Sequence, residues 1–122
     1  MADLSFETLE SQNEVPQGSF IVANGKVLLD IGAFIGRPVA ALSESAVVDL
    51  VYQLIKVGAA AQTAINAGDG QPLPPGERLA AFAAPAIQPP RTSPDGQLYA
   101  LATGSVTAVL PIQVGAAQAP KQ

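Results

Sequence analysis

The chain of 122 residues contains no cysteine, no histidine and no tryptophan. Without cysteine it can form no disulfide and offers no thiolate ligand to a metal. Without histidine it also lacks the commonest general base and the commonest metal-binding side chain. These absences argue against a disulfide-stabilised fold, a transition-metal site and most nucleophilic enzymes. We therefore expect no catalytic residues, no cofactor and no metal.

Charge is also scarce. Only 13% of the residues are charged, about half the usual share for a soluble domain, whereas 48% are hydrophobic. The net charge is −4, and the six basic residues stand singly along the chain, at Lys26, Arg37, Lys56, Arg78, Arg91 and Lys121. Nucleic-acid binding needs a clustered basic surface, so we expect no nucleic-acid partner. A low-charge surface is instead typical of one that other proteins cover.

Long hydrophobic runs are missing as well. The most apolar stretch, residues 46–61, is interrupted by Asp49, Gln53 and Lys56 and is shorter than the roughly 20 residues that a membrane-spanning helix needs. The first ten residues, MADLSFETLE, are acidic and polar, which does not fit a secretion signal. We expect no membrane contact and a cytoplasmic location, or a virion if the gene belongs to a phage.

The strongest local signal is a β-hairpin over residues 19–31, SFIVANGKVLLDI. Asn24 and Gly25 separate two apolar runs, and both residue types tolerate the positive φ angles of a type I′ turn. Both arms are apolar on both faces, which predicts a hairpin that is covered on both sides.

A long helix is predicted over residues 44–67. Ser43 is suited to cap its start, and Gly68 follows Asn66 and Ala67 at its end. Residues 32–42, with two glycines and Pro38, are predicted to form a loop. The helix would be about 36 Å long.

The rest of the chain favours β-structure. Residues 78–87 are predicted as a strand with Pro85 at an edge or bend, residues 94–96 as a turn, and residues 98–112 as β-structure with an interruption near Thr103. Residues 1–18 are compatible with either helix or strand. We treat 1–122 as one domain, with residues 1–18 and 113–122 as extended arms.

The long helix has an apolar arc that is wider than one sheet would cover. We therefore predict that it contacts the same helix of a second subunit as well as its own sheet; packing on its own sheet alone is the alternative. The predicted interface residues are Val47, Val51, Leu54, Ile55, Gly58, Ala61 and Ile65.

Sequence motifs for chemistry are weak. The segment GAFIG follows a strand, but Arg37 and Pro38 replace the lysine and hydroxyl residue that end a phosphate-binding loop. Carboxylate pairs such as Asp30 with Asp49 could serve acid–base chemistry only if the fold brought them together. The acidic residues Asp3, Glu7, Glu10 and Glu14 are predicted to form a solvated face.

Together these patterns predict an α+β fold, in which an antiparallel sheet of the 19–31 hairpin and the C-terminal strands packs on the helix 44–67. An all-β core with one inserted helix is the alternative. The predicted function is non-catalytic and structural: a homo-oligomer, in contact with other structural proteins of a larger assembly. A small ligand-binding module or a carboxylate-based enzyme is the second hypothesis.

In general character the chain resembles small virion proteins of tailed phages, such as capsid cement or tail components. The resemblance rests on the acidic beginning MADLSFETLE, the compact hairpin FIVANGKVLL and the Ala- and Pro-containing tail GAAQAPKQ. It implies a protein that acts through its surfaces as part of a capsid or tail, and it carries over no functional residues.

Overall fold

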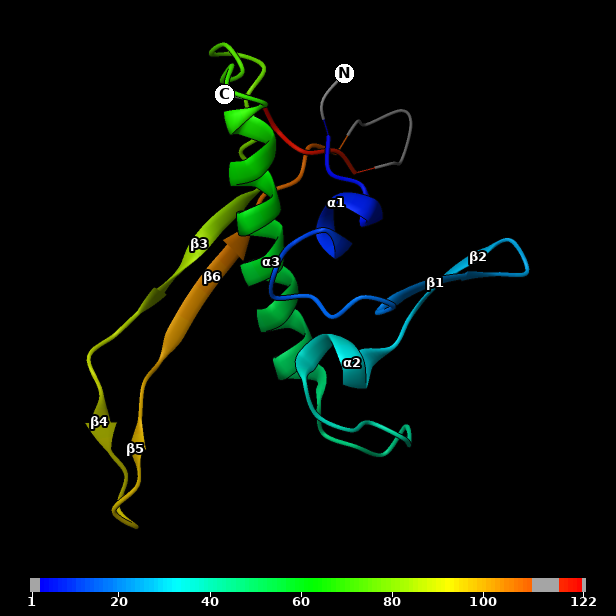
Figure 1. The fold of residues 1–122 in the computed structure, drawn as a ribbon. Helices are drawn as coiled ribbons and strands as arrows, with labels where there is room; N and C mark the ends of the chain where they lie inside the picture. Colours follow the sequence, from blue (N-terminus) through cyan, green and yellow to red (C-terminus); the bar gives the residue numbers. More distant parts are fainter. Residues whose placement is uncertain (1–2, 111–116, 122) are drawn as a thin grey trace.

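A computed structural model describes residues 3–110 and 117–121 (Figure 1). Two short helices and six strands are arranged around the longest helix, α3. In chain order these elements are α1 (Phe6–Glu10), β1 (Phe20–Ala23), β2 (Lys26–Leu29), α2 (Ile31–Ile35), α3 (Val47–Ala67), β3 (Phe82–Ile87), β4 (Arg91–Thr92), β5 (Leu98–Tyr99) and β6 (Ala102–Val106).

The predicted fold class is confirmed, since antiparallel sheets accompany one long helix that packs against strands. The strands form three separate two-stranded sheets, β1–β2, β3–β6 and β4–β5, where the sequence suggested one continuous sheet. In Figure 1 the β1–β2 hairpin projects from one side of α3, and the β3–β6 and β4–β5 pairs extend along and beyond its other side. The two predicted sheet components therefore lie on opposite sides of the helix and cannot pair.

The predicted hairpin forms, and its turn has the predicted geometry. Ile21 pairs with Leu28 and Val22 with Val27, and the turn residues Asn24 and Gly25 have φ angles of 52° and 71°. The expectation that the hairpin is covered on both faces is wrong for the single chain. Val22 is 78% exposed and its partner Val27 53% exposed, because the hairpin extends away from the rest of the domain.

Two helix boundaries differ from the prediction. Residues 32–35, predicted as loop, and Ile31, predicted as the end of the hairpin, form α2, because the Asp30 carboxylate accepts a hydrogen bond from Ala33 N at the start and Gly36 ends the helix with a φ of 79°. Helix α3 begins at Val47, three residues after the predicted start, and its N-cap Ala46 makes no side-chain hydrogen bond. Its end at Gly68 is confirmed.

The core lies where the N-terminal half of the chain meets α3. Val15, Phe34 and Val57 form its buried centre, and the partly buried residues Leu9, Phe20, Leu29, Ile35, Leu50 and Leu54 surround them. Because Val15 and Leu9 belong to this core, the described part of segment 1–18 is packed on the domain, which corrects the prediction of an extended arm. Its ambiguous secondary structure resolves as helix α1, capped by Ser5.

At the C-terminal end, the described residues 117–121 also return to the domain. Gln118 pairs with Val109, and Lys121 pairs with Leu79 in isolated antiparallel bridges. The predicted arm 113–122 is therefore held to the domain in this part, and its other residues lie outside the described chain.

The longest projection is the strand pair β3–β6, continued by β4–β5; we call residues 82–106 the long arm. Its register shifts between Ala83 and Ala86, beside Pro85, which agrees with the predicted bend. The predicted turn at residues 94–96 is present, and the C-terminal β-structure is interrupted at residues 100–101 instead of near Thr103. From residue 86 to residue 110 every residue except Ser93 is exposed.

Two amide side chains of α3, one helical turn apart, fasten the root of the long arm. Gln62 Oε1 accepts hydrogen bonds from Ala81 N (2.7 Å) and Phe82 N (3.0 Å), and its Nε2 donates to Phe82 O (2.8 Å). Asn66 makes the corresponding pair with the N and O of Leu79, at 2.7 and 3.0 Å. These side-chain amides provide hydrogen-bond partners for the largely buried backbone N–H and C=O groups of residues 79–82, which no neighbouring strand pairs along its whole length.

We expect the substitution Gln62→Leu to lower the free energy of unfolding by about 2 kcal/mol, because it leaves partly buried amides without partners. Gln53→Leu is the matched control, since Gln53 is the other glutamine of α3 and makes no hydrogen bond of this kind among those of the described residues. Urea denaturation of both variants provides the measurement. Equal loss of stability in the two variants would show that the hydrogen bonds of Gln62 contribute nothing specific.

Candidate functional site

The carboxylates that the sequence marked for acid–base chemistry have separate structural partners. Asp30 caps α2, whereas Asp49 accepts a hydrogen bond from Arg37 Nε at 3.0 Å in an ion pair. In the N-terminal acidic stripe, Glu14 pairs with Lys56 at 3.5 Å. Glu10 is partly buried and accepts hydrogen bonds from Gly18 N (3.0 Å) and Phe20 N (3.2 Å), so the stripe is not simply a solvated face.

The carboxyl groups of Glu44 and Asp95 have lowered pKa values, and the cause in each case is hydrogen bonding within a loop. Hydrogen bonds from the backbone amides of Ala40 and Ala41 hold the pKa of Glu44 below its ordinary value. The Ser93 hydroxyl, followed by Gln97 N, lowers the pKa of Asp95 in the same way. In both cases hydrogen bonds from the same loop stabilise the charged form of an exposed carboxylate. These carboxylates order their own loops and are not prepared to exchange a proton with a substrate.

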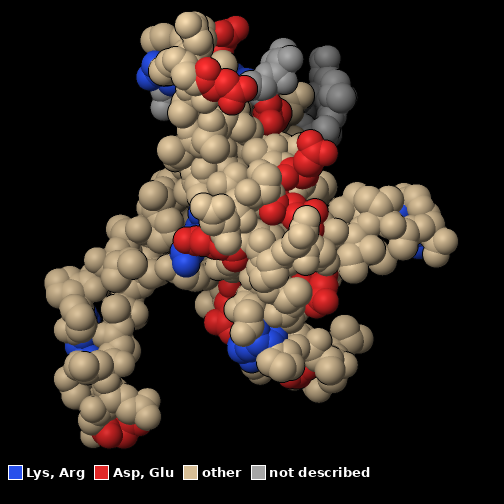
Figure 2. Space-filling model, in the orientation of Figure 1, with Lys and Arg blue, Asp and Glu red and all other residues tan. Residues whose placement is uncertain are grey.

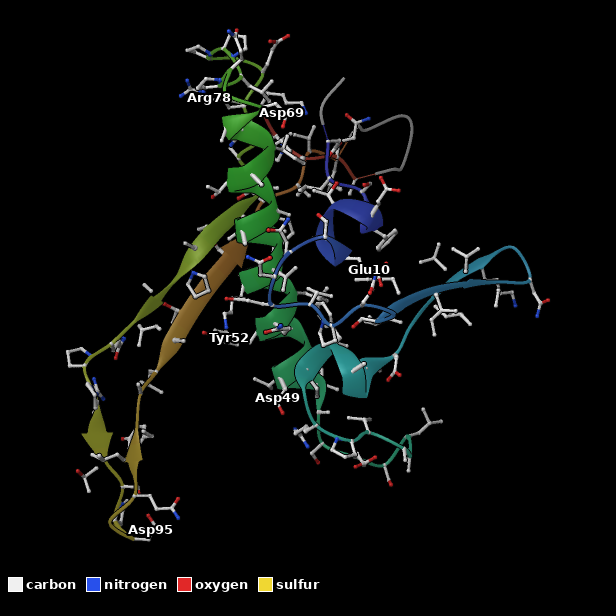
Figure 3. All side chains as sticks on the ribbon, in the orientation of Figure 1. Glu10, Asp49, Tyr52, Asp69, Arg78 and Asp95 are labelled. Carbon is white, nitrogen blue, oxygen red and sulfur yellow. The ribbon has the colours of Figure 1, made fainter. Side chains whose placement is uncertain are left out.

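The charged side chains do not converge. In Figure 3, Asp95 lies at the tip of the long arm, Asp49 near the start of α3, and Asp69 and Arg78 at the opposite end of that helix. Among residues 3–110 and 117–121, no group of three or more acidic residues could hold a metal ion. Within the same residues, every buried polar side-chain atom has a hydrogen-bond partner.

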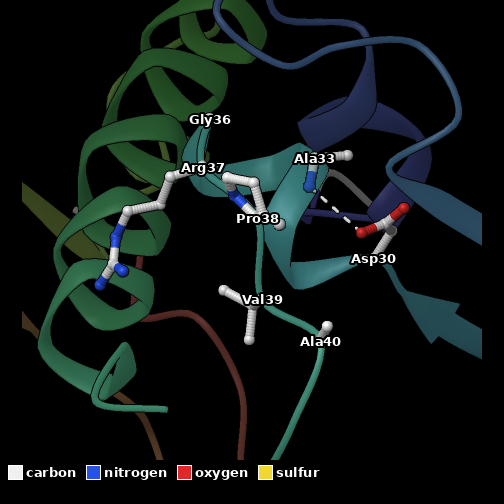
Figure 4. A pocket seen from close by; sticks show the side chains of 8 residues that line it. Asp30, Ala33, Gly36, Arg37, Pro38, Val39 and Ala40 are labelled. Atoms are coloured by element: carbon white, nitrogen blue, oxygen red, sulfur yellow. Dashed lines mark hydrogen bonds between the residues drawn. The ribbon is translucent and has the colours of Figure 1, made fainter.

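A depression beside α2 is the place where a small ligand would be sought first. It has a volume of about 440 Å³ and is lined by Asp30, Gly32, Ala33 and residues 36–40. Figure 4 shows the Asp30 carboxylate turned toward Ala33 N and the Arg37 side chain extended toward α3. Its two charged side chains are therefore engaged in capping and ion pairing, and they do not converge on a common point.

The seven predicted interface residues fall into two groups. Val47 and Val51 are 69% and 49% exposed and are available to a second subunit. The other five are covered at least partly by the chain itself: Leu54 packs on the core, Ile55 contacts Gly104, Ile65 is half-buried, and Gly58 and Ala61 are buried. The predicted oligomer stays a prediction, and the part of α3 that could take part in it is its N-terminal half.

The most unusual surface belongs to the two projections. The short hairpin, residues 20–29, carries Lys26 as its only charge, and the long arm carries only Arg91 and Asp95. In Figure 2 both projections are almost free of the charged side chains that mark the central body. The long arm and the segment that follows it expose large apolar side chains, among them Ile87 (68%), Leu98 (77%) and Leu110 (69%).

A groove opens where the long arm diverges from α3; we call it the helix groove. Its volume is about 420 Å³, with Val48, Asp49 and Tyr52 on the helix side and Ile87, Ala100 and Ala102 on the arm side. Val48 is 81% exposed. Asp49 is the only charged residue that lines the groove, which is otherwise mainly apolar.

Sequence reasoning missed this surface, although a signal was present. The stretch 79–110 contains two charged residues and four prolines. A hairpin surrounded by water would usually carry more charged side chains. Its apolar residues were assigned to a sheet against the helix, because the sequence does not show where the arm leaves α3.

The total exposed surface is large for the size of the chain. A compact monomer of 12.4 kDa exposes about 6,100 Å², whereas this chain exposes 8633 Å². The excess of about 2,500 Å² is comparable to the area that one subunit buries in a large permanent interface.

No family model, curated protein or solved structure matches this chain. In the part of the chain that the structure describes, none of the helices has the length and hydrophobicity needed to cross a membrane.

Proposed function

We propose that this protein is a non-catalytic structural subunit that associates with further copies of itself in a larger assembly. The observation that carries the proposal is the excess surface of about 2,500 Å², together with two projections that expose apolar side chains. A two-stranded hairpin has marginal stability by itself. Apolar hairpins that project from a small core therefore gain stability when neighbouring subunits cover them.

The resemblance to small virion proteins of tailed phages is compatible with this function and suggests a capsid or tail as the assembly. A virion location, or a cytoplasmic one before assembly, belongs to the same proposal. The alternative of a ligand-binding module lacks support from the depression beside α2, whose charged groups serve the fold.

Light scattering coupled to size-exclusion chromatography tests the proposal. We expect a mass that is a multiple of 12.4 kDa at micromolar concentration, because burial of about 2,500 Å² is typical of permanent association. A monodisperse monomer at high micromolar concentration would contradict self-association. Stoichiometric binding of a metabolite by that monomer would favour the ligand-binding alternative.

A further inference from the structure

The short hairpin needs cover on both of its faces. Strand pairing places Ile21 beside Leu28 on one face and Val22 beside Val27 on the other. Ile21 and Leu28 are 45% and 47% exposed, and the Val22–Val27 face is more open still. A surface that is apolar on two faces is buried best by insertion between two walls, because docking on a flat surface would cover only one face.

The helix groove offers two such walls. Val48 and Tyr52 of α3 form one wall, and Ile87 with Ala102 forms the other. Two further hollows with mainly apolar linings have volumes of about 190 and 200 Å³, less than half that of the helix groove. The shape of the groove and the two-faced hairpin are therefore complementary.

Their charges are complementary as well. Lys26, at the tip of the hairpin, is its only charged residue, and Asp49 is the only charged residue that lines the groove. Asp49 already pairs with Arg37, but its side chain remains 52% exposed. It can therefore accept a second cation from the side of the groove.

A chain cannot fill its own groove. Figure 1 shows β1–β2 projecting from the side of α3 opposite to the long arm, and the base of the hairpin is fixed to the core through Phe20 and Leu29. The matching hairpin must therefore come from another copy. A contact between two different surfaces of identical subunits is heterologous and builds rings or filaments.

We propose that the short hairpin of one copy inserts into the helix groove of a second copy, so that subunits join head to tail. This inference rests on the proposed function and specifies the surfaces through which the subunits associate. Each subunit then contributes one hairpin and accepts one.

Cysteine cross-linking of the full chain tests the contact, since the natural sequence contains no cysteine. Val22→Cys and Val48→Cys place thiols on exposed positions of the hairpin and the groove. The two variants, one carrying an affinity tag, are mixed, allowed to exchange and treated with a short bis-maleimide. We expect the mixed dimer as the dominant product, and little product from either variant alone.

Thr63→Cys replaces Val48→Cys in the control, because Thr63 is exposed on the same helix about 22 Å away. We also expect Lys26→Glu to weaken association by about two- to fivefold, as loss of a partly exposed ion pair does. If the protein is oligomeric but Val48→Cys links to itself, or Val22→Cys links equally to Thr63→Cys, the inserted hairpin is wrong and the structural function stands. If scattering shows a monomer, both proposals fail.

Discussion

Replacement of Phe34 by alanine is expected to lower the free energy of unfolding by about 3–5 kcal/mol. Phe34 is 1% exposed and is the largest fully buried side chain among the described residues. It packs against Val15 and Val57, and its ring meets that of Phe20 edge to face at 5.7 Å. The cavity left by the substitution would lie in the middle of a small core that has little other material to fill it.

Phe6→Ala is the matched control for this variant. Phe6 is 57% exposed, and its ring contacts Phe20 at 5.6 Å. We expect a loss of at most about 1 kcal/mol from this change. Thermal unfolding at one low protein concentration keeps association from masking the difference. The melting temperature should fall by about 10 °C or more for Phe34→Ala, and similar melting temperatures for the two variants would place the core elsewhere.

Gly58→Leu is expected to cost about 3 kcal/mol, at the upper end of the range for an overpacked core. A Cβ atom at Gly58 would lie 2.7 Å from two ring atoms of Phe82, so any side chain must displace that ring. The sequence suggested a close contact at Gly58 with the helix of another subunit. The structure places β3 of the same chain there, so the cost should already be present in the monomer.

Ala60→Leu serves as the control, since Ala60 is exposed two residues further along α3. A double-mutant cycle with Phe82→Ala identifies the cause. Removal of the ring should recover at least about 1 kcal/mol of the cost of Gly58→Leu. If Gly58→Leu costs the same with and without Phe82, the clash with this ring is not its cause.

Local signals were sufficient to predict several elements of the fold. Asn24 and Gly25 specify the hairpin turn, because few other residue pairs adopt two consecutive positive φ angles. Gly68 marks the end of α3 for a similar reason. These features depend on the conformational preferences of one or two residues, which are present in the sequence itself.

Features that depend on distant contacts could not be predicted in this way. Ser43 has the chemistry of an N-cap, but α3 begins at Val47 after a loop in which Glu44 binds the amides of Ala40 and Ala41. The apolar faces of the short hairpin predicted that it is covered, but in the single chain these faces are exposed. A sequence pattern shows which surfaces are apolar and does not show which molecule covers them.

The same limit applies to the candidate site. Val47 and Val51 were recognised as apolar positions of α3, but the groove beside Val48 arises from the angle at which the long arm leaves the helix. Near this point the register of the arm shifts beside Pro85, and the ring of Phe82 lies against Gly58. Pro85 indicates a bend in the sequence but not its angle, and the contact between Phe82 and Gly58 has no signature within a short stretch of sequence.

The hydrogen bonds of Gln62 and Asn66 also have a mechanical consequence. They fix the root of the long arm to α3. The outer part of the arm makes no comparable hydrogen bonds to α3 among the described residues, so the arm can rotate about its root. From Phe82 to Asp95 it reaches up to about 43 Å, so that a rotation of about 5° at the root displaces the tip by about 4 Å. In the proposed assembly, small differences in the angle between subunits would be accommodated by rotation at the root of the arm.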